Sequence, residues 1–247
     1  MHLAETPWPE AGAVETDLAV LPVGSTEQHG PHAPLGTDTT TATAVAEEGV
    51  DRADIAAVVA PPIPVGVAAE HRQFPGTLWV QADTFRAYVR ETCASLAAHG
   101  WDRIVVVNGH GGNVTALREL CGTLTRSADA YAVPFTWFDA IDLAEFGVEM
   151  GHGGAAETSM LRHLVPEQVN EEKLDEAAEG GAAGWGEFHA GVNLAFDTAE
   201  FSENGTVGDP TDSSAEIGER LLDAAGSQLA DLLAVVDERD VSRPPDR

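Results

Sequence analysis

The stretch LAVLPVGSTEQHGPH, residues 18–32, joins an apolar run to a cluster of carboxylate and histidine side chains. Similar short runs rich in Val, Ile and Ala recur between segments with helical spacing. Such alternation is typical of βα units around a mostly parallel sheet. We therefore predict an α/β fold with strands over residues 18–23, 55–60, 104–107 and 132–135.

Apolar residues at helical spacing predict four helices. They cover residues 83–99, a segment after Asn113, a segment from about 157 to just before Pro166, and residues 211–236 or thereabouts. Asp83 is the expected N-cap of the first helix, and Gly100 is expected to close its end. The acidic, glycine-rich segment 171–190 is predicted to be a surface loop that could close as a lid.

The charge of the chain excludes two classes of partner. It has 247 residues with 13 Lys or Arg against 41 Asp or Glu, a formal net charge of −28. Phosphate backbones and anionic membrane surfaces are bound through basic side chains, so neither nucleic acid nor a membrane is an expected partner. Disordered acidic chains are poor in apolar residues, whereas 43% of this chain is hydrophobic.

The cations are twelve arginines and one lysine, Lys173. A folded protein with a dense carboxylate surface suits molar salt, where the Debye length is about 3 Å. We therefore expect a halophilic source, such as a salt-adapted archaeon, and a cytoplasmic location. Neither secretion nor a membrane span is expected, because the first residues lack a basic patch followed by an apolar run and no stretch approaches 18 apolar residues.

The whole chain, residues 1–247, reads as a single domain, with the informative motifs between about 18 and 238. Its size is common for one α/β domain. Cys93 and Cys121 lie in helix-like segments and form no CxxC pair. They are expected to be small core residues rather than a disulfide or a metal site.

Three clusters carry side chains suited to metal binding. Glu27 and His29 follow the first predicted strand, and Asp38 comes nine residues after His29. Parallel α/β sheets collect ligands at the carboxyl ends of their strands, and this ligand set suits Zn²⁺, Mn²⁺ or Fe²⁺. Taken alone, the segment could equally be a polar turn with a locally hydrogen-bonded histidine.

The second cluster, NGHGGN, places His110 at the end of the strand predicted over 104–107. It could instead cradle phosphate, although it lacks the established spacing of such loops. In the third cluster, His152 precedes Glu157, which could also be a first-turn acid that favours the helix dipole. The three clusters together favour a metal site.

Successive blocks of the chain resemble the creatininase family of metal-dependent amidohydrolases. They are LPVGSTEQHGPHAPLGTDT, EHRQFPGT, VNGHGGN, HGGAAETS and NGTVGDPTDSSAEIGER, in this order. The resemblance implies a three-layer α/β sandwich, a homo-oligomer, by analogy a hexamer, and two divalent ions per chain. It implies that Glu27 and His110 hold one ion, that His29 holds the other, and that Asp38 bridges both. It also makes His152 the catalytic histidine, puts Glu157 in or beside the ligand set, and puts Trp137 near the substrate.

The departures from creatininase concern the substrate. Gly111 and Gly112 stand where creatininase has a tyrosine and a metal-binding glutamate, and Val148 replaces a tryptophan. We expect Glu157 to replace the lost ligand. Creatinine is therefore an unsafe assignment. The NGHGGN pattern is shared with deformylases of a formylaminopyrimidine nucleotide and with mycofactocin precursor peptidases, and the segment from Asn204 is closest to the latter.

Other residues are expected near the substrate. The two glycines, Gly111 and Gly112, should allow close approach to it. Arg72 could meet an anionic substrate group, or could pair with Glu70 on the surface. His71 and His32 could each line the pocket.

The predicted reaction is hydrolysis of a carbon–nitrogen bond in a small cyclic amide, a formamide or a peptide. Water activated by the metal ions would attack the carbonyl, with His152 as the proton donor to the leaving nitrogen. A non-catalytic small-molecule binding protein is the competing class. A serine mechanism through Ser25 or Ser159 ranks lower because neither shows a triad arrangement.

Overall fold

The protein, seen here as a computed structural model that describes residues 1–127 and 129–242, is built around one parallel sheet. Its strand order is β2-β1-β3-β4, and each neighbouring pair is parallel. The strands are β1 (Leu18–Val23), β2 (Val58–Val59), β3 (Arg103–Asn108) and β4 (Tyr131–Thr136). Val23 pairs with Asn108, which pairs with Thr136, so three strands end at the same level.

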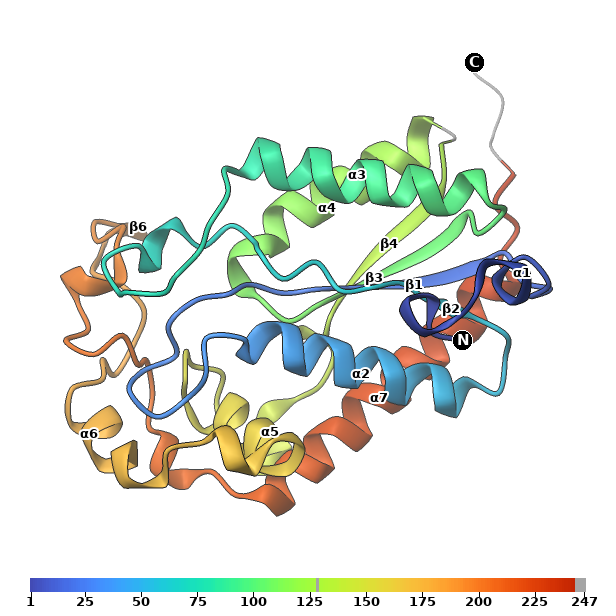
Figure 1. The fold of residues 1–247 in the computed structure, drawn as a ribbon. Helices are drawn as coiled ribbons and strands as arrows, with labels where there is room; N and C mark the ends of the chain where they lie inside the picture. The colour runs from blue at the N-terminus through green and yellow to red at the C-terminus, as the bar shows by residue number, and fades with distance from the viewer. Residues whose placement is uncertain (128, 243–247) are drawn as a thin grey trace.

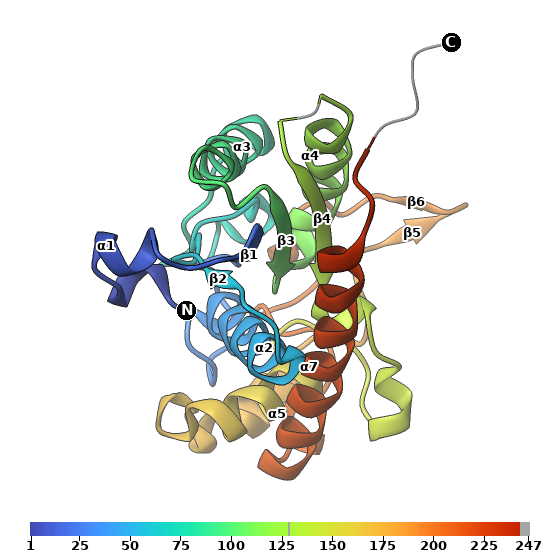
Figure 2. The same ribbon diagram turned by 90° about the vertical axis from the view of Figure 1, so that its right-hand side faces the viewer.

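Helices cover both faces of the sheet and make the predicted three layers (Figures 1 and 2). One face carries α3 (Ala82–Ala98) and α4 (Val114–Ser127). The other face carries α2 (Thr37–Ala53), α5 (Ala155–Leu164) and α7 (Ala215–Glu238). Smaller elements are α1 (Trp8–Ala11), α6 (Leu174–Glu179) and the hairpin of β5 (Phe188–His189) and β6 (Val192–Asn193), which projects from the body in Figure 2.

Two hydrophobic cores result from the alternation of side chains along the buried strands. Leu21 and Val106 point toward α3 and α4, whereas Val20 and Val105 point toward α2 and α7. Residues on both faces of the central strands are buried, as expected for a parallel sheet covered on both sides. The two cysteines are unpaired and lie in the first core, as predicted.

Helix α2 is an element that the apolar pattern did not predict. Its sequence, TDTTTATAVAEEGVDRA, buries mainly small residues, including Ala42, Val45 and Gly49. The helix lies close against α7: a Cβ built on Gly49 would be 2.5 Å from Leu229 Cδ2. Small side chains allow this close approach. Because few of them are large and apolar, the sequence shows no clear helical spacing of hydrophobic residues from which α2 could be predicted.

Three other predictions need correction. The strand predicted over 55–60 is restricted to Val58–Val59. The N-cap of α3 is Gln81 rather than Asp83, which lies within the helix and pairs with Arg86 at 2.5 Å. The helix predicted from about residue 211 begins at Ala215, because the Ser214 side chain accepts a hydrogen bond from the Ile217 N–H.

The segment 171–190 is also more ordered than a surface loop. It contains α6, whose Leu174 and Ala177 are buried. These two apolar side chains anchor a segment that is otherwise polar.

The strand order indicates where a ligand can bind at the edge of the sheet. The chain leaves β1 through α2 on one face to reach β2, and then returns through α3 on the other face to β3. The connections therefore diverge between β1 and β3, and such a switch point opens a crevice at the carboxyl ends of the strands. Within the described part of the chain, no helix is long and apolar enough to cross a membrane.

Candidate functional site

The predicted ligands converge at the carboxyl ends of β1 and β3. Glu27 and His29 follow β1, His110 follows β3, and Asp38 belongs to the first turn of α2. Each of these four residues is at least 96% buried, the most exposed being His110 at 4%. The structure therefore brings together residues that the sequence separates by more than eighty positions.

Two glycines allow α2 to approach the strand ends. A Cβ on Gly24 would lie 2.5 Å from the Thr39 nitrogen, and a Cβ on Gly109 would lie 2.2 Å from the Asp38 carbonyl oxygen. No side chain larger than hydrogen fits such spaces without movement of the backbone. The glycines after β1 and within NGHGGN therefore set the position of Asp38.

The first ligand group consists of Glu27, Asp38 and His110. His110 Nδ1 lies 3.2 Å from Glu27 Oε1 and 3.3 Å from Asp38 Oδ2. The candidate ligand atoms of all three residues lie within 4.8 Å of one another, which is the spacing needed to surround one cation.

The second group forms around His29. Its Nε2 lies 3.0 Å from Asp38 Oδ1 and 3.7 Å from Glu157 Oε2. The two oxygens of Asp38 thus face different histidines, His29 and His110. This arrangement fits a carboxylate that bridges two cations.

Hydrogen bonds from the far side of each ring determine which histidine nitrogen can bind metal. His29 Nδ1 lies 3.1 Å from the Glu27 carbonyl oxygen, and His110 Nε2 lies 2.7 Å from the Val67 carbonyl oxygen. A carbonyl oxygen can only accept, so both of these nitrogens carry the hydrogen. The nitrogens facing the carboxylates are then free to bind a metal ion, as in known metal sites where the outer N–H is held by a carbonyl.

The carboxylates of Glu27 and Asp38 have oxygens that a bound cation could neutralise. Both side-chain oxygens of Glu27 and Asp38 Oδ2 are buried and make no hydrogen bond within residues 1–127 and 129–242. Buried charge without a partner is costly. A divalent cation at this position would satisfy these oxygens.

The pKa values of the cluster also indicate that its carboxylates favour a positive charge beside them. Burial would lower the pKa of His29 and His110, but the adjoining carboxylates raise each to about 10. Burial would raise the pKa of Glu27, but the facing histidines, His110 first, bring it below its ordinary value. In the metal-free cluster, protons therefore supply positive charge that metal ions can replace.

His152 and Glu157 complete the cluster from the turn before α5. The His152 ring is stacked between those of His29 and His71, with centroids 4.2 Å and 4.1 Å away. Its Nε2–H donates to the Gln28 carbonyl, and its Nδ1 lies 3.7 Å from Glu27 Oε1. Burial, followed by the neighbouring His29, lowers the pKa of His152 well below its ordinary value, so the ring is neutral near pH 7.

Glu157 is held by the backbone of the same turn. Its Oε2 accepts a hydrogen bond of 2.7 Å from the Gly153 N–H. Burial raises its pKa to about 7. The carboxylate can therefore exchange a proton near neutrality or ionise beside a bound cation.

The cluster opens into a cavity of about 380 Å³. Three of the candidate ligands and His152 form one wall, and the other walls consist of glycines, a carboxylate, a second histidine and apolar side chains. The lining residues are Asp38, Glu70, His71, His110, Gly111, Gly112, Phe138, Met150, Gly151, His152, Glu157 and Trp185. Gly111 and Gly112 thus line the cavity as predicted, together with His71.

Two predicted substrate-binding residues lie elsewhere. Trp137 is fully buried in the core beside α7, because the turn after β4 directs it inward, and Phe138 reaches the cavity instead. Arg72 is exposed and pairs at 2.5 Å with Asp197, not with Glu70. His32 also lies outside the cavity lining, where it bonds Thr158 Oγ1 at 2.9 Å.

The sequence interpretation missed several residues of the site. Trp185 comes from the segment predicted to be a loop, and its ring centroid lies 6.1 Å from that of His152. A tryptophan within a polar, glycine-rich segment was the available signal. Gln28, between Glu27 and His29, stood in no pattern that distinguished it. Its Nε2 contacts two residues far along the chain, His71 and Gly205.

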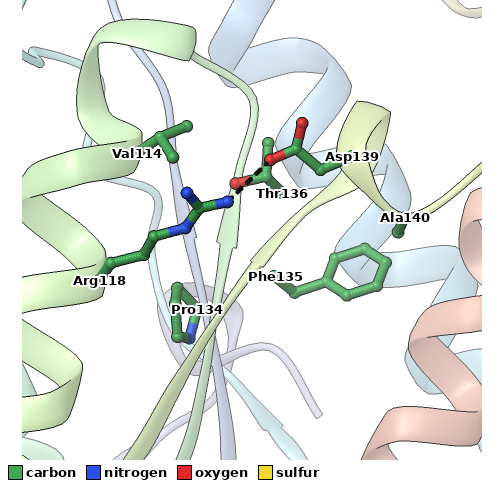
Figure 3. A pocket seen from close by; sticks show the side chains of 7 residues that line it. All are labelled: Val114, Arg118, Pro134, Phe135, Thr136, Asp139 and Ala140. Carbon is green, nitrogen blue, oxygen red and sulfur yellow. Dashed lines mark hydrogen bonds and ion pairs between the residues drawn. The ribbon is translucent and has the colours of Figure 1, made fainter.

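A separate hollow of about 200 Å³ lies beyond the end of β4 (Figure 3). Arg118 and Asp139 face each other across it at 3.3 Å. Both side chains are at least half exposed, so the pair is weak. No histidine lines this hollow, and it does not resemble the metal-binding cluster.

Comparisons with known proteins agree with the geometry. The family profile described as "Creatininase: Creatinine amidohydrolase" matches residues 4–233. The chain is 40% identical over 210 residues to the mycofactocin precursor peptide peptidase of Mycolicibacterium smegmatis, covering 83% of this chain and 79% of the relative.

Solved creatininase structures are more distant in sequence but share the fold. A manganese form is 26% identical with a TM-score of 0.81, covering 96% of this chain and 99% of the other. A Zn-Zn form is 25% identical with a TM-score of 0.82, covering 96% and 98%. The predicted α/β fold of the creatininase type is confirmed.

Proposed function

The chain belongs to the creatininase family, a family of amidohydrolases, and from this we propose that it cleaves an amide bond of a peptide with the help of divalent cations. The observation that carries the proposal is the buried cluster of Glu27, Asp38, His29 and His110, which holds carboxylate oxygens without a hydrogen bond. Asp38 and His110 of this cluster line the cavity. Without a metal ion, the charge of these carboxylates is balanced only by extra protons on His29 and His110, which a divalent cation can replace.

Two cations are expected, Zn²⁺, Mn²⁺ or Fe²⁺ by the chemistry of the ligands. Glu27, His110 and Asp38 would hold one, and His29, Asp38 and Glu157 the other. When bound, such ions lower the pKa of water and polarise the amide carbonyl. Glu157 would thereby replace the carboxylate that creatininase carries at the position of Gly112.

His152 is proposed to move the proton. Its Nε2–H is held by the Gln28 carbonyl, so Nδ1 is the free acceptor on the side of Glu27. Because the ring is neutral near pH 7, it enters the reaction as an acceptor for the proton of the attacking water. It then returns this proton to the leaving nitrogen, which is a poor leaving group unless protonated. This order refines the expectation that His152 acts only as a donor.

The space around the site favours a peptide over creatinine. A second hollow of about 530 Å³ adjoins the cavity and shares Met150, Gly151 and Trp185 with it. The glycines at 111 and 112 add no side chain where creatininase has two large ones. An extended substrate can therefore occupy both spaces, which accords with the peptidase named above as a relative.

The test is an assay of the protein loaded with Mn²⁺ or Zn²⁺ in molar KCl. Substrates are a mycofactocin-type precursor peptide, the same peptide with the susceptible bond N-methylated, a formylaminopyrimidine nucleotide and creatinine. New peptide ends detected by mass spectrometry, absent in Asp38→Asn, support the proposal.

Hydrolysis of creatinine or of the nucleotide without cleavage of peptide would reassign the substrate. A protein that binds no metal after reconstitution, and cleaves none of these compounds, would be a non-catalytic binding protein.

A further inference from the structure

The Gln28 side chain has only one possible amide orientation. Its Oε1 accepts a 2.9 Å hydrogen bond from the Gly30 N–H, and its Nε2 donates at 3.1 Å to the Gly205 carbonyl. A backbone N–H can only donate and a carbonyl can only accept. Exchanging the amide nitrogen and oxygen would break both bonds.

The same Nε2 determines the tautomer of His71. It lies 2.8 Å from His71 Nδ1, which must therefore accept the amide hydrogen. Thr198 Oγ1 lies 3.0 Å from the same ring nitrogen. With Nδ1 occupied as an acceptor, the single hydrogen of a neutral imidazole is on Nε2.

The protonated nitrogen points into the carboxylate cluster. His71 Nε2 lies 3.4 Å from Glu27 Oε1, and the ring stacks on His152 at an interplanar angle of 14°. The side chain is almost fully buried, so its orientation is limited by packing on every side. We propose that His71 is a positioning residue whose Nε2–H attracts Glu27 Oε1 electrostatically, across 3.4 Å and without a hydrogen bond, and so orients it for the metal site, and that Gln28 keeps the hydrogen on that nitrogen. This inference rests on the proposed metal-dependent function.

The proposal excludes one alternative ligand group. Glu27, His71 and His152 are close enough to surround a cation. A ligating histidine must present an unprotonated nitrogen, however, and His71 presents an N–H. The group of Glu27, Asp38 and His110 remains, as do the carboxylates of Asp38 and Glu157 around His29. His71 is therefore not assigned to the metal.

The proposal also explains the NGT segment at residues 204–206, which had no assigned role. Gly205 has a φ of +88°, and a Cβ there would lie 1.9 Å from Gln28 Oε1. Thr206 N–H donates to Asn204 Oδ1, and Gly205 N–H donates to Ser202 Oγ. This turn therefore presents the Gly205 carbonyl to Gln28, and glycine is required for both its conformation and its size.

The first test measures the tautomer directly, on metal-free protein labelled with ¹⁵N. Long-range ¹H–¹⁵N spectra should show His71 with a proton on Nε2 and an unprotonated Nδ1. In Gln28→Glu the neighbour becomes an acceptor, so Nδ1 should become protonated. Gln228→Glu, a change of equal charge at an exposed position of α7, should leave the signals of His71 unchanged.

The second test measures binding of Mn²⁺ by titration in variants of His71. His71→Gln can place an amide N–H near the position of Nε2, whereas His71→Leu cannot. We expect His71→Leu to bind about 10- to 100-fold more weakly than the wild type, with His71→Gln recovering most of the loss.

An Nδ1–H tautomer in the wild type, or equal Mn²⁺ affinities of the Gln and Leu variants, would overturn the proposal. A direct Mn²⁺-induced broadening of His71 Nε2 as strong as that of His29 Nε2 would make His71 a ligand instead. The spectra that show the tautomer require no substrate. The position of the hydrogen on His71 can therefore be established even if the protein proves not to be a peptidase.

Discussion

Gly109 provides the sharpest test of how the site is assembled. Its substitution by Ala would place a Cβ 2.2 Å from the Asp38 carbonyl oxygen, whereas ordinary contacts begin at 3.4 Å. The end of β3 and the first turn of α2 would have to separate by about 1.2 Å, the difference between these two distances. Functional sites require positions held within about 0.5 Å, so His110 and Asp38 should no longer share a cation.

The expected effects of Gly109→Ala are a loss of about 1 to 3 kcal/mol in the free energy of unfolding and a loss of about 10- to 100-fold in metal affinity. Urea denaturation of the metal-free protein measures the first, and Mn²⁺ titration measures the second. The matched control is Gly111→Ala, two residues along the same loop, where an added Cβ meets nothing within 4 Å. Its free energy of unfolding should stay within about 0.5 kcal/mol of the wild type.

Equal stability and equal metal affinity in the two alanine variants would show that the contact between Gly109 and α2 does not position Asp38. The end of α2 would then be free to move, and the short distance at Gly109 would not define the site. Loss of stability without loss of metal affinity would show that Asp38 follows the backbone shift, and the proposed geometry would need revision.

Four further predictions concern the ligands, the proton transfer and the solvent. Glu157→Gln should reduce the metal content from two ions to one, measured by elemental analysis beside the exposed control Glu167→Gln; two retained ions would remove Glu157 from the ligand set. His152→Ala should lower kcat by about 10²- to 10⁴-fold with metal content unchanged, and metal lost in proportion to activity would make His152 a ligand. The pKa of His29 and of His110 is raised from 6.5 to about 10 in the folded protein, so their stabilisation is complete below pH 6.5 and is lost as the pH rises through 10. The melting temperature of metal-free protein should therefore fall between pH 7 and pH 10, and Mn²⁺ should reduce this fall; a flat profile without metal contradicts the assignment. Finally, melting temperature should rise between 0.1 M and 1 M KCl, as the Debye length shortens from about 10 Å to about 3 Å, and a salt-independent value would argue against adaptation to high salt.

The sequence predicted those residues of the site that lie next to the end of a predicted strand. Glu27 and His29 directly follow an apolar run, and His110 directly follows another. Parallel strands end at one edge, so the convergence of these residues needs no further information. Asp38 was included through its motif, although the helix that carries it was not predicted.

Other residues depend on packing that leaves no periodic trace. Trp137 and Phe138 are adjacent in the sequence, yet one is buried in the core and the other lines the cavity. A single turn of the chain after β4 decides between them. Arg72 likewise had two available partners, and the position of Asp197, 125 residues away, determines which carboxylate it meets.

Three features can be predicted from the order of residues alone: the α/β class with a mostly parallel sheet, the edge of the sheet where the site lies, and the kinds of ligand that gather there. Each of these follows from hydrophobic periodicity and from side chains next to the strand ends. Three other features follow from packing in the folded chain: which nitrogen of each histidine faces the cluster, which glycines let α2 approach, and which aromatic residues form the cavity. These features depend on differences of a few tenths of an ångström in the distances between residues far apart in the chain, and hydrogen-bond direction and close packing set those distances.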